Sequence, residues 1–392
     1  MVVLYQKTIS KNFVKKATAV IVTVFTAASV FSVYPVHAET KPELSVSAQS
    51  AILVNAVDGS TLWAKNAQQK RPMASTTKIM TALLTLEAAA CNNRVVEVTA
   101  DMLRVEGSSM GLQSGDRISL SGLAAGMLST SGNDAAIVAS YALAGGPVAF
   151  AKKMNQRAQE LGMASSHFVT PSGLDNDEHY STAEDMAKLA CAAMKNETFA
   201  AITSRKSVKV AFAQPACTRM YTNHNKLLAQ YQGCIGVKTG FTKKSGRCLV
   251  SCAQRNGVRL IAVTLNAPDD WKDHQTMLDY GFTKLKSVTL DDSTYSVSLP
   301  LIGGSAASVQ VTGEAGSTLV LPKDATLERR VELPHFLYAP LEKGDLVGQV
   351  SYLVNGREVG HTALTAGPVA AQGTTQQNFW QKVVCFFQSL FR

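Results

Sequence analysis

The stretch RPMASTTKIMTAL at residues 71–83 decides how this chain is interpreted. From Ser75 to Ala90 the sequence has no Gly or Pro and is rich in Ala, Leu and Thr, which predicts a helix that begins at Ser75. Ser75 and Lys78 then lie one turn apart on the same face, where the lysine amine can reach the serine hydroxyl. Serine becomes an effective nucleophile once a base removes its proton, and burial or a nearby positive charge can make a lysine that base by lowering its pKa.

The Ser-x-x-Lys spacing alone is a weak signal, because a solvent-exposed helix can carry it by chance. Lys78 is nevertheless the only lysine in the chain with a serine three positions before it. A helix that begins at Ser75 also directs its first backbone N–H groups and the positive end of its dipole toward a developing oxyanion. The pair therefore predicts a nucleophilic serine with its own base.

Two further motifs have residue types suited to the same chemistry. Ser131-Gly132-Asn133 precedes a helical stretch at Asp134–Ala144, so its hydroxyl could relay a proton to a departing amine while its amide holds the substrate backbone. Lys238-Thr239-Gly240 follows an apolar run, where a cation and a hydroxyl on an open strand edge would hold a carboxylate. Alone, the first motif could be a turn with a helix cap, and the second an ordinary edge-strand lysine.

Each of these two motifs has a rival in the sequence. Tyr221-Thr222-Asn223 could replace the Ser131 motif, and Lys244-Ser245-Gly246 could replace the Lys238 motif. We prefer Ser131 because it opens a helix, and Lys238 because an apolar strand leads into it.

The three motifs, in this order, resemble the Ser-x-x-Lys, Ser-x-Asn and Lys-Thr-Gly set of penicillin-binding proteins and serine β-lactamases. Longer runs are similar to those of the low-molecular-weight D-alanyl-D-alanine carboxypeptidases: residues 71–83, FVTPSGL at 168–174, YSTAEDMA at 180–187, NHNKLL at 223–228, SGNDAA at 131–136 and GVKTGFT at 236–242. The resemblance spans roughly residues 41–282, with weaker likeness across 287–370. It implies a serine-type carboxypeptidase that removes the terminal D-alanine of peptidoglycan stem pentapeptides through an acyl-enzyme and is inhibited by β-lactam antibiotics such as penicillins.

The resemblance also implies roles for single residues. Ser75 would be the acylated nucleophile and Lys78 its general base, while Ser131 and Lys238 would form the proton relay and the electrostatic network. Asn133 would bind the peptide.

Further implied roles fall on the third motif and beyond it. Thr239 would contact the terminal carboxylate, and Gly240 would allow close approach of the backbone. The oxyanion hole would be the backbone N–H groups of Ser75 and Phe241. Some relatives have an arginine after the third motif that grips the carboxylate, and Arg247 is the substitute candidate here.

The pattern of elements predicts an α+β sandwich with an antiparallel sheet, and the resemblance makes this the penicillin-binding and serine β-lactamase-like transpeptidase fold. Residues 100–200 are expected to carry several helical stretches, and the chain turns strand-like from Gln232. Turns at Asp58-Gly59 and Asn256-Gly257 predict hairpins, the second joining Leu249–Ala253 to Val258–Leu265. Residues 41–282 are expected to form the catalytic domain.

Short alternating runs of Val, Ser and Thr beyond Lys286 predict a separate small all-β domain at residues 287–370. Asn355-Gly356 marks a strong hairpin signal within it. We expect this domain to act as a stalk that lifts the active site off the membrane.

The sequence patterns at the two ends of the chain predict targeting signals. Residues 1–38 combine four lysines, an apolar stretch at Ala17–Val33 and small residues before a cleavage site after Ala38, which predicts a signal peptide rather than a retained membrane anchor. Residues 376–392 place eight apolar side chains, most of them aromatic, within an arc of roughly 160° of a helix. This amphipathic helix could dock on the protein's own core, but we favour a membrane anchor, and expect a peripheral protein on the extracytoplasmic face of the bacterial cell membrane.

Composition narrows the remaining choices. Removing the four lysines of the signal lowers the net charge from +9 to +5, with no basic stripe that would indicate nucleic acid binding. We expect no cofactor and no metal, since His167, His179 and His224 lack paired ligand spacing. Because the chain has seven cysteines, at least one is unpaired, and a disulfide between Cys217 and Cys234 is one possible pairing. The alternative functions are a β-lactamase, which the absence of glutamate in residues 165–176 disfavours, and a catalytically silent wall-binding protein.

Overall fold

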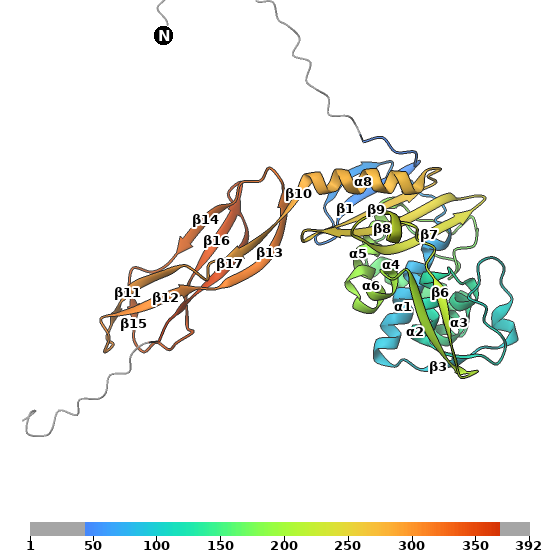
Figure 1. Ribbon diagram of the computed structural model, residues 1–392, viewed down its shortest axis with the longest axis horizontal. Coiled ribbons are helices and arrows are strands. Elements are labelled where there is room, and N and C mark those ends of the chain that lie inside the picture. Colours follow the sequence, from blue (N-terminus) through green and yellow to red (C-terminus); the bar gives the residue numbers. More distant parts are fainter. Residues whose placement is uncertain (1–43, 369–392) are drawn as a thin grey trace, which may run out of the picture. The chain divides into compact units, whose positions relative to one another are not determined.

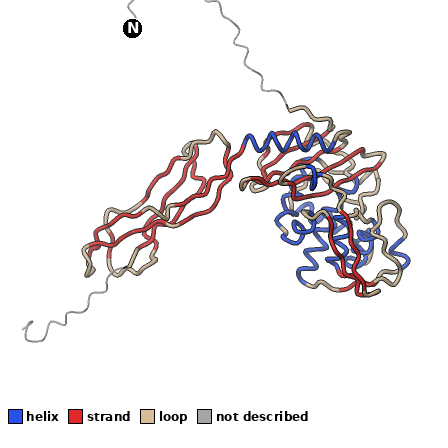
Figure 2. Tube along the Cα trace, in the orientation of Figure 1, coloured by secondary structure: helices blue, strands red, loops and turns tan. Residues whose placement is uncertain are grey.

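The computed structural model describes residues 44–368, and its helices and strands are shown in Figures 1 and 2. The predicted signal peptide at 1–38 and the predicted amphipathic helix at 376–392 lie outside the described residues. Within residues 44–368 no single helix is both long and apolar enough to cross a membrane, although one sharply bent pair of helices passes by length and composition alone.

The first part of the described chain is built on a five-stranded antiparallel sheet with the order β2-β1-β9-β8-β7. Its strands are β1 Ser50–Asn55, β2 Thr61–Lys65, β7 Cys234–Thr242, β8 Gly246–Arg255 and β9 Val258–Leu265. The expected hairpins at Asp58-Gly59 and Asn256-Gly257 join β1 to β2 and β8 to β9. Strand β7 ends this sheet, so its outer edge has no strand partner among the described residues.

Both faces of this sheet are buried, which explains why its inner strands read as apolar runs instead of alternating. Ile52 and Val54 of β1 contribute to a core shared with the helices of one face. Ala51 and Leu53 point to the opposite face, where they pack with α8, Asp270–Lys284 (Figure 1).

Most helices belong to the first of these cores. They are α1 Lys78–Cys91, α2 Leu120–Ser129, α3 Asn133–Ala144, α4 Pro147–Glu160, α5 Ala183–Lys195 and α6 Glu197–Thr203. Short helices complete the set: 3-10 helices η1 Ala74–Thr77 and η2 Ala100–Leu103, and α7 Leu227–Gln230, which precedes β7. The helix expected from Ser75 thus begins as a 3-10 turn and becomes α-helical at Lys78.

A second antiparallel sheet has the order β3-β4-β5-β6, and only β4 lies within residues 100–200, where the sequence predicts helical stretches. Its strands are β3 Val95–Glu97, β4 Arg117–Ser119, β5 Ser207–Gln214 and β6 Cys217–Thr222. The sequence patterns do not predict these strands, and the expectation that the chain turns strand-like from Gln232 is wrong, because β5 and β6 come before that residue. Strand β5 alternates buried and exposed side chains, with Val208, Val210 and Phe212 inward.

The remaining described chain forms a β-rich domain that starts where α8 ends at Lys284. A six-stranded sheet has the order β14-β16-β17-β12-β11-β15, and β10 pairs with β13. The strands are β10 Leu285–Asp291, β11 Ser296–Ile302, β12 Ser308–Gly313, β13 Ala315–Pro322, β14 Glu328–Glu332, β15 Leu337–Tyr338, β16 Leu346–Val354 and β17 Arg357–Ala366. The Asn355-Gly356 turn joins β16 to β17 as expected.

The described cysteines are all free, so the bridge left open between Cys217 and Cys234 is not formed. Cys248 and Cys252 of β8 are buried, and burial raises the pKa of the Cys248 thiol to about 11. These thiols behave as small apolar core side chains.

Candidate active site

The amine of Lys78 lies directly against the hydroxyl of Ser75. Its Nζ is 2.9 Å from Ser75 Oγ, at the junction where η1 passes into α1. Lys78 is completely buried, whereas Ser75 is only partly covered and can be reached by a ligand. Burial and the neighbouring Lys238 charge lower the pKa of Lys78 well below its ordinary value, against the opposing effect of Asp134. A neutral amine beside a hydroxyl is the arrangement that can accept its proton.

A loop that the sequence motifs do not mark holds this amine in place. Lys78 Nζ also donates to the backbone oxygen of Ser172 at 2.6 Å. The following Gly173 has φ of +82°, and a Cβ there would lie 2.0 Å from the backbone oxygen of Ala74. Only glycine allows the loop to approach η1 this closely, so Gly173 fixes the second partner of Lys78.

His179 fastens the same loop to η1. Its Nδ1 accepts the backbone N–H of Val169 at 2.9 Å, which leaves Nε2 to donate to Thr77 Oγ1 at 2.8 Å. Burial, with smaller effects of His167 and Lys78, lowers the pKa of His179 to about 4. The ring is therefore neutral near pH 7 and serves as a structural link.

The second motif lies at the start of α3. Ser131 is buried and has φ of +61°, a left-handed conformation that is uncommon outside glycine. Asn133 Nδ2 donates to the backbone oxygen of Glu106 at 2.6 Å, while its Oδ1 is buried without a hydrogen-bond partner among the described residues. A substrate N–H could satisfy this oxygen, which suits the peptide-binding role expected for Asn133.

Asp134 organises the loop that holds Asn133. Its carboxylate accepts hydrogen bonds from Ser109 Oγ at 2.6 Å and from the backbone N–H groups of Met110 and Leu112 at 2.9 and 3.0 Å. The loop therefore folds around a buried anion, and it presents the Glu106 oxygen to Asn133.

The third motif forms the open edge of the central sheet. Lys238 is buried, its Nζ donates to the backbone oxygen of Thr239 at 2.8 Å, and burial lowers its pKa to about 7. A Cβ on Gly240 would lie 3.1 Å from the backbone nitrogen of Ser75. Strand β7 therefore packs its glycine directly on the turn that carries the nucleophile, with Phe241 exposed beside it.

Arg247 lies opposite Phe241 in the pairing of β8 with β7. Its guanidinium is half exposed and 3.7 Å from Asp270, the first residue of α8. This side chain is near the third motif, but its part in gripping a carboxylate stays a prediction.

The rival motifs have local partners instead. Lys244 forms an ion pair with Asp177, and Ser245 bonds to Thr242 within the turn between β7 and β8. Asn223 donates to the backbone oxygen of Thr203, which ties down the end of β6. Both motifs serve local structure.

The histidines do not gather into a ligand set. His167 Nδ1 contacts the backbone oxygen of Glu178, and His224 is lowered in pKa by burial and by Lys238. Within residues 44–368, no group of three or more His, Cys, Asp or Glu side chains is arranged to hold a metal ion.

Comparison with known proteins places this geometry in a family. The sequence profile of D-alanyl-D-alanine carboxypeptidases matches residues 36–269, more than half of the chain. The chain belongs to this family of low-molecular-weight penicillin-binding proteins. It is 31% identical to the D-alanyl-D-alanine carboxypeptidase DacC of Escherichia coli over 88% of this chain and 90% of that protein. It is 29% identical to DacF of Bacillus subtilis over 84% of this chain and 86% of that protein.

Solved structures give the same result for the fold. The D-alanyl-D-alanine carboxypeptidase DacD from Francisella tularensis is 26% identical, with a TM-score of 0.60 over 84% of this chain and 94% of that chain. Penicillin-binding protein 5 from Haemophilus influenzae is 27% identical, with a TM-score of 0.59 over 83% and 97%. The expected transpeptidase-type fold with a β-rich second domain is confirmed.

Proposed function

We propose that this chain is a serine D-Ala-D-Ala carboxypeptidase that removes the terminal D-alanine of peptidoglycan stem pentapeptides through an acyl-enzyme on Ser75. The observation that carries this conclusion is the buried, partly neutral amine of Lys78 placed 2.9 Å from Ser75 Oγ, with the β7 edge packed behind it. Membership of the D-alanyl-D-alanine carboxypeptidase family supplies the substrate class.

Acylation begins when neutral Lys78 accepts the proton of Ser75 Oγ, which attacks the carbonyl carbon of the penultimate D-alanine. The tetrahedral oxyanion lies between the backbone N–H groups of Ser75 and Phe241, on two elements that already pack together at Gly240. The proton held by Lys78 then passes through the Ser131 hydroxyl to the departing amine. The C–N bond breaks, and free D-alanine leaves with its carboxylate.

Substrate position comes from the flanking motifs. Thr239 and the charge of Lys238 face the terminal carboxylate from the β7 edge, and the unpaired Asn133 Oδ1 accepts a backbone N–H of the peptide. Water then attacks the ester, Lys78 accepts its proton, and the shortened peptide is released. Replacing this water by an amine of another stem peptide would give transpeptidation through the same intermediate.

β-Lactams fit the same site as inhibitors. Their strained amide acylates Ser75, and their carboxylate takes the place of the terminal carboxylate of the peptide. The stretch 165–176 has no glutamate that could activate water as in class A β-lactamases, which supports a long-lived adduct over turnover.

We place the enzyme on the extracytoplasmic face of the bacterial cell membrane as a peripheral protein. The signal pattern of residues 1–38 supports export, and the aromatic amphipathic pattern of residues 376–392 supports attachment to the membrane surface. The substrate class supports the same location, because peptidoglycan lies outside the cytoplasm.

One experiment separates this function from its alternatives. The chain and a Ser75→Ala variant are incubated with labelled penicillin and with a pentapeptide ending in D-Ala-D-Ala. We expect a lasting adduct and release of D-alanine from the native chain, and neither from the variant. Rapid penicillin turnover would indicate a β-lactamase instead, and the absence of both adduct and D-alanine would indicate a silent wall-binding protein.

A further inference from the structure

One end of the β-rich domain exposes adjoining apolar side chains on a single face. Leu301 and Ile302 of β11 lie beside Leu337 and Tyr338 of β15 in parallel register. Leu301 and Leu337 point into the core, so Ile302 and Tyr338 share the outer face. They are 46% and 66% exposed.

Two more residues extend this face. Phe336 is two positions before Tyr338 and therefore on the same side, with its ring centroid 5.3 Å from that of Tyr338 in an edge-to-face contact. Pro300 is exposed and two positions before Ile302. We call these four residues, Pro300, Ile302, Phe336 and Tyr338, the apolar tip.

The apolar tip differs from the rest of the same face. Toward the other end of the β11–β12 hairpin the outward side chains are Ser296, Ser298, Gln310 and Thr312. The change from polar to apolar occurs within one strand. Single exposed apolar residues need no explanation, but contiguous ones indicate a contact surface.

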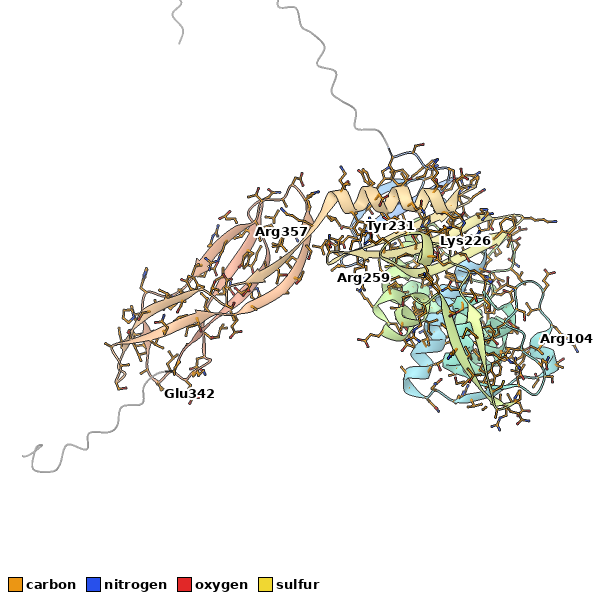
Figure 3. All side chains as sticks on the ribbon, viewed as in Figure 1. Arg104, Lys226, Tyr231, Arg259, Glu342 and Arg357 are labelled. Atoms are coloured by element: carbon orange, nitrogen blue, oxygen red, sulfur yellow. The ribbon has the colours of Figure 1, made fainter. Side chains whose placement is uncertain are left out.

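The last described residues lie at the same end of the β-rich domain as the apolar tip. Ala366 pairs with Val311, and the backbone N–H of Gly367 donates to Gln310, so the last described residues run along β12 toward the β11–β12 turn. Figure 3 labels Glu342 at this end of the domain and Arg357 at the other. Seven residues separate Pro368 from residue 376, a reach of at most about 29 Å.

The residues beyond this end decide which partner fits. The 376–392 sequence carries Phe379, Trp380, Phe386, Phe387 and Phe391, an aromatic composition typical of segments that lie in a membrane interface. If this segment lies in the membrane, residues 369–375 act as a short tether. They hold the end of the β-rich domain within a few nanometres of the lipid. Tyr, Phe and Ile side chains are suited to insert among headgroups there.

We propose that the apolar tip is a second lipid-contacting surface, which inserts into the outer face of the membrane beside the C-terminal segment. This inference rests on the membrane attachment in the proposed function. Two weak contacts joined by a short tether bind far more tightly than either alone, because the second binding event becomes intramolecular. The tip would then fix which end of the β-rich domain faces the lipid.

The test compares vesicle binding of the chain starting at Glu39 with that of an Ile302→Ser/Tyr338→Ser variant. Vesicles of phosphatidylethanolamine and phosphatidylglycerol are sedimented with each protein. We expect the partition coefficient to fall about tenfold, in proportion to the apolar area removed from the contact. Val57→Ser/Val148→Ser is the matched control, since both valines are well exposed outside the β-rich domain, and its partition should not change.

A direct readout places the tip in the lipid. Tyr338→Trp should be quenched by brominated lipids, whereas Val148→Trp should not. Unchanged partition of the double variant would overturn the proposal. So would lipid-free binding of a 376–392 peptide to the native chain that is lost in the double variant, or concentration-dependent dimerisation lost in that variant, since either gives the tip another occupant.

Failure of the underlying attachment has a different signature. A native chain that does not sediment with vesicles, like a chain ending at Gln372, would remove the C-terminal attachment and the tip proposal together. Release of D-alanine from a soluble pentapeptide is measured in the same samples and tests the enzymatic function separately.

Discussion

The Lys78 amine is kept neutral at a cost to folding. In the unfolded chain this lysine is protonated up to its ordinary pKa, whereas in the folded protein burial and Lys238 favour the neutral form. The unfolded state therefore binds more protons between the lowered pKa and the ordinary one. Stability contributed by this residue must rise with pH over that interval.

We expect Lys78→Met to abolish acylation by labelled penicillin and to raise the free energy of unfolding near pH 7 by on the order of 1–2 kcal/mol. The fluorescence of Trp63 and Trp271, both in the part of the chain with the central sheet, reports urea unfolding from pH 6 to 10. The variant should lose the part of the pH slope that Lys78 supplies. Lys152→Met, at an exposed position of α4, is the control. Identical slopes in the native and Lys78→Met chains would contradict this account.

The charge of Lys238 acts on Lys78 as well as on substrate. Burial is the larger cause of the lowered Lys78 pKa, and the positive charge of Lys238 is the next. Lys238→Gln should therefore raise the pKa of Lys78 and move the acidic limb of the acylation rate to higher pH. The pH profile of labelled penicillin acylation measures this, with Lys226→Gln as an exposed control. A slower rate with an unshifted limb would limit Lys238 to carboxylate binding.

At the scale of elements, one buried histidine links helix α8 to two strands of the central sheet, β8 and β9. His274 Nδ1 contacts Ser251 Oγ at 2.5 Å and Nε2 contacts Thr264 Oγ1 at 2.9 Å. Burial lowers the pKa of His274 to about 3. In the unfolded chain the His274 imidazole takes up a proton near pH 6.5, whereas in the folded chain it stays neutral until about pH 3. The free energy of unfolding therefore falls as pH drops from about 6.5 toward 3.

His274→Gln should remove about 1.4 kcal/mol per pH unit from the acid-side slope of the unfolding free energy, the value for one proton. It should also lower stability at pH 7 through loss of a hydrogen bond. Urea unfolding between pH 4.5 and 7 measures both effects, and His335→Gln at an exposed site is the control. An acid-side slope that stays as steep as in the native chain would mean that His274 is not the titrating group.

The elements that sequence reasoning found have strong local signals. The turn at Asn256-Gly257 and the apolar runs around it define β8 and β9, and the helical stretch expected at Asp134–Ala144 is α3, which ends before Gly145. Strands β3 and β4 have three residues each, too few for a period to emerge. Strand β5 does alternate, and a count of period-two matches over Ser207–Gln214 could have found it.

For the candidate site, the motifs predict Ser75, Lys78 and Lys238 because the expected chemistry needs their side-chain groups, and the structure brings the Lys78 amine to the Ser75 hydroxyl. Sequence does not reveal the backbone oxygen of Ser172, since any residue supplies a carbonyl. The only local signal for this contact is Gly173, which follows Ser172. The reason for a glycine there is visible only in the folded chain, where Ala74 packs against it. Contacts between distant segments set these partners, and spacing along the chain does not encode them.

At the scale of the molecule, the β-rich domain has its own polar centre. Asp292 is buried and accepts hydrogen bonds from Tyr352 Oη at 2.7 Å, from Thr362 Oγ1 and from Arg329, whose Nη2 is also 2.7 Å away. These partners come from β14, β16 and β17. One carboxylate therefore joins three strands of the six-stranded sheet.

Asp292→Ala should destabilise the β-rich domain by about 2 kcal/mol, because it leaves the buried hydroxyls of Tyr352 and Thr362 without their acceptor. The labelled penicillin adduct should form at the native rate, since none of these contacts involves the site around Ser75. Limited proteolysis after residue 284 and adduct formation measure the two effects on one sample. Asp291→Ala, at the exposed neighbouring position, is the control. Loss of acylation in the Asp292 variant would show that the catalytic part depends on this domain.

The left-handed backbone of Ser131 and Ala74 has a consequence for how copies of this protein would evolve. Ala74 precedes the nucleophile and Ser131 begins the second motif, both in a conformation that glycine adopts more easily, and the Lys78 amine is an unfavourable group to bury. Substitutions that relieve the backbone strain or remove the buried amine would raise the free energy of unfolding, but they would stop catalysis. A duplicated copy that is no longer selected for hydrolysis would therefore tend to become a more stable, inactive binder of cell-wall peptides. This chain retains Ser75, Lys78 and Lys238, which indicates that it has not followed that course.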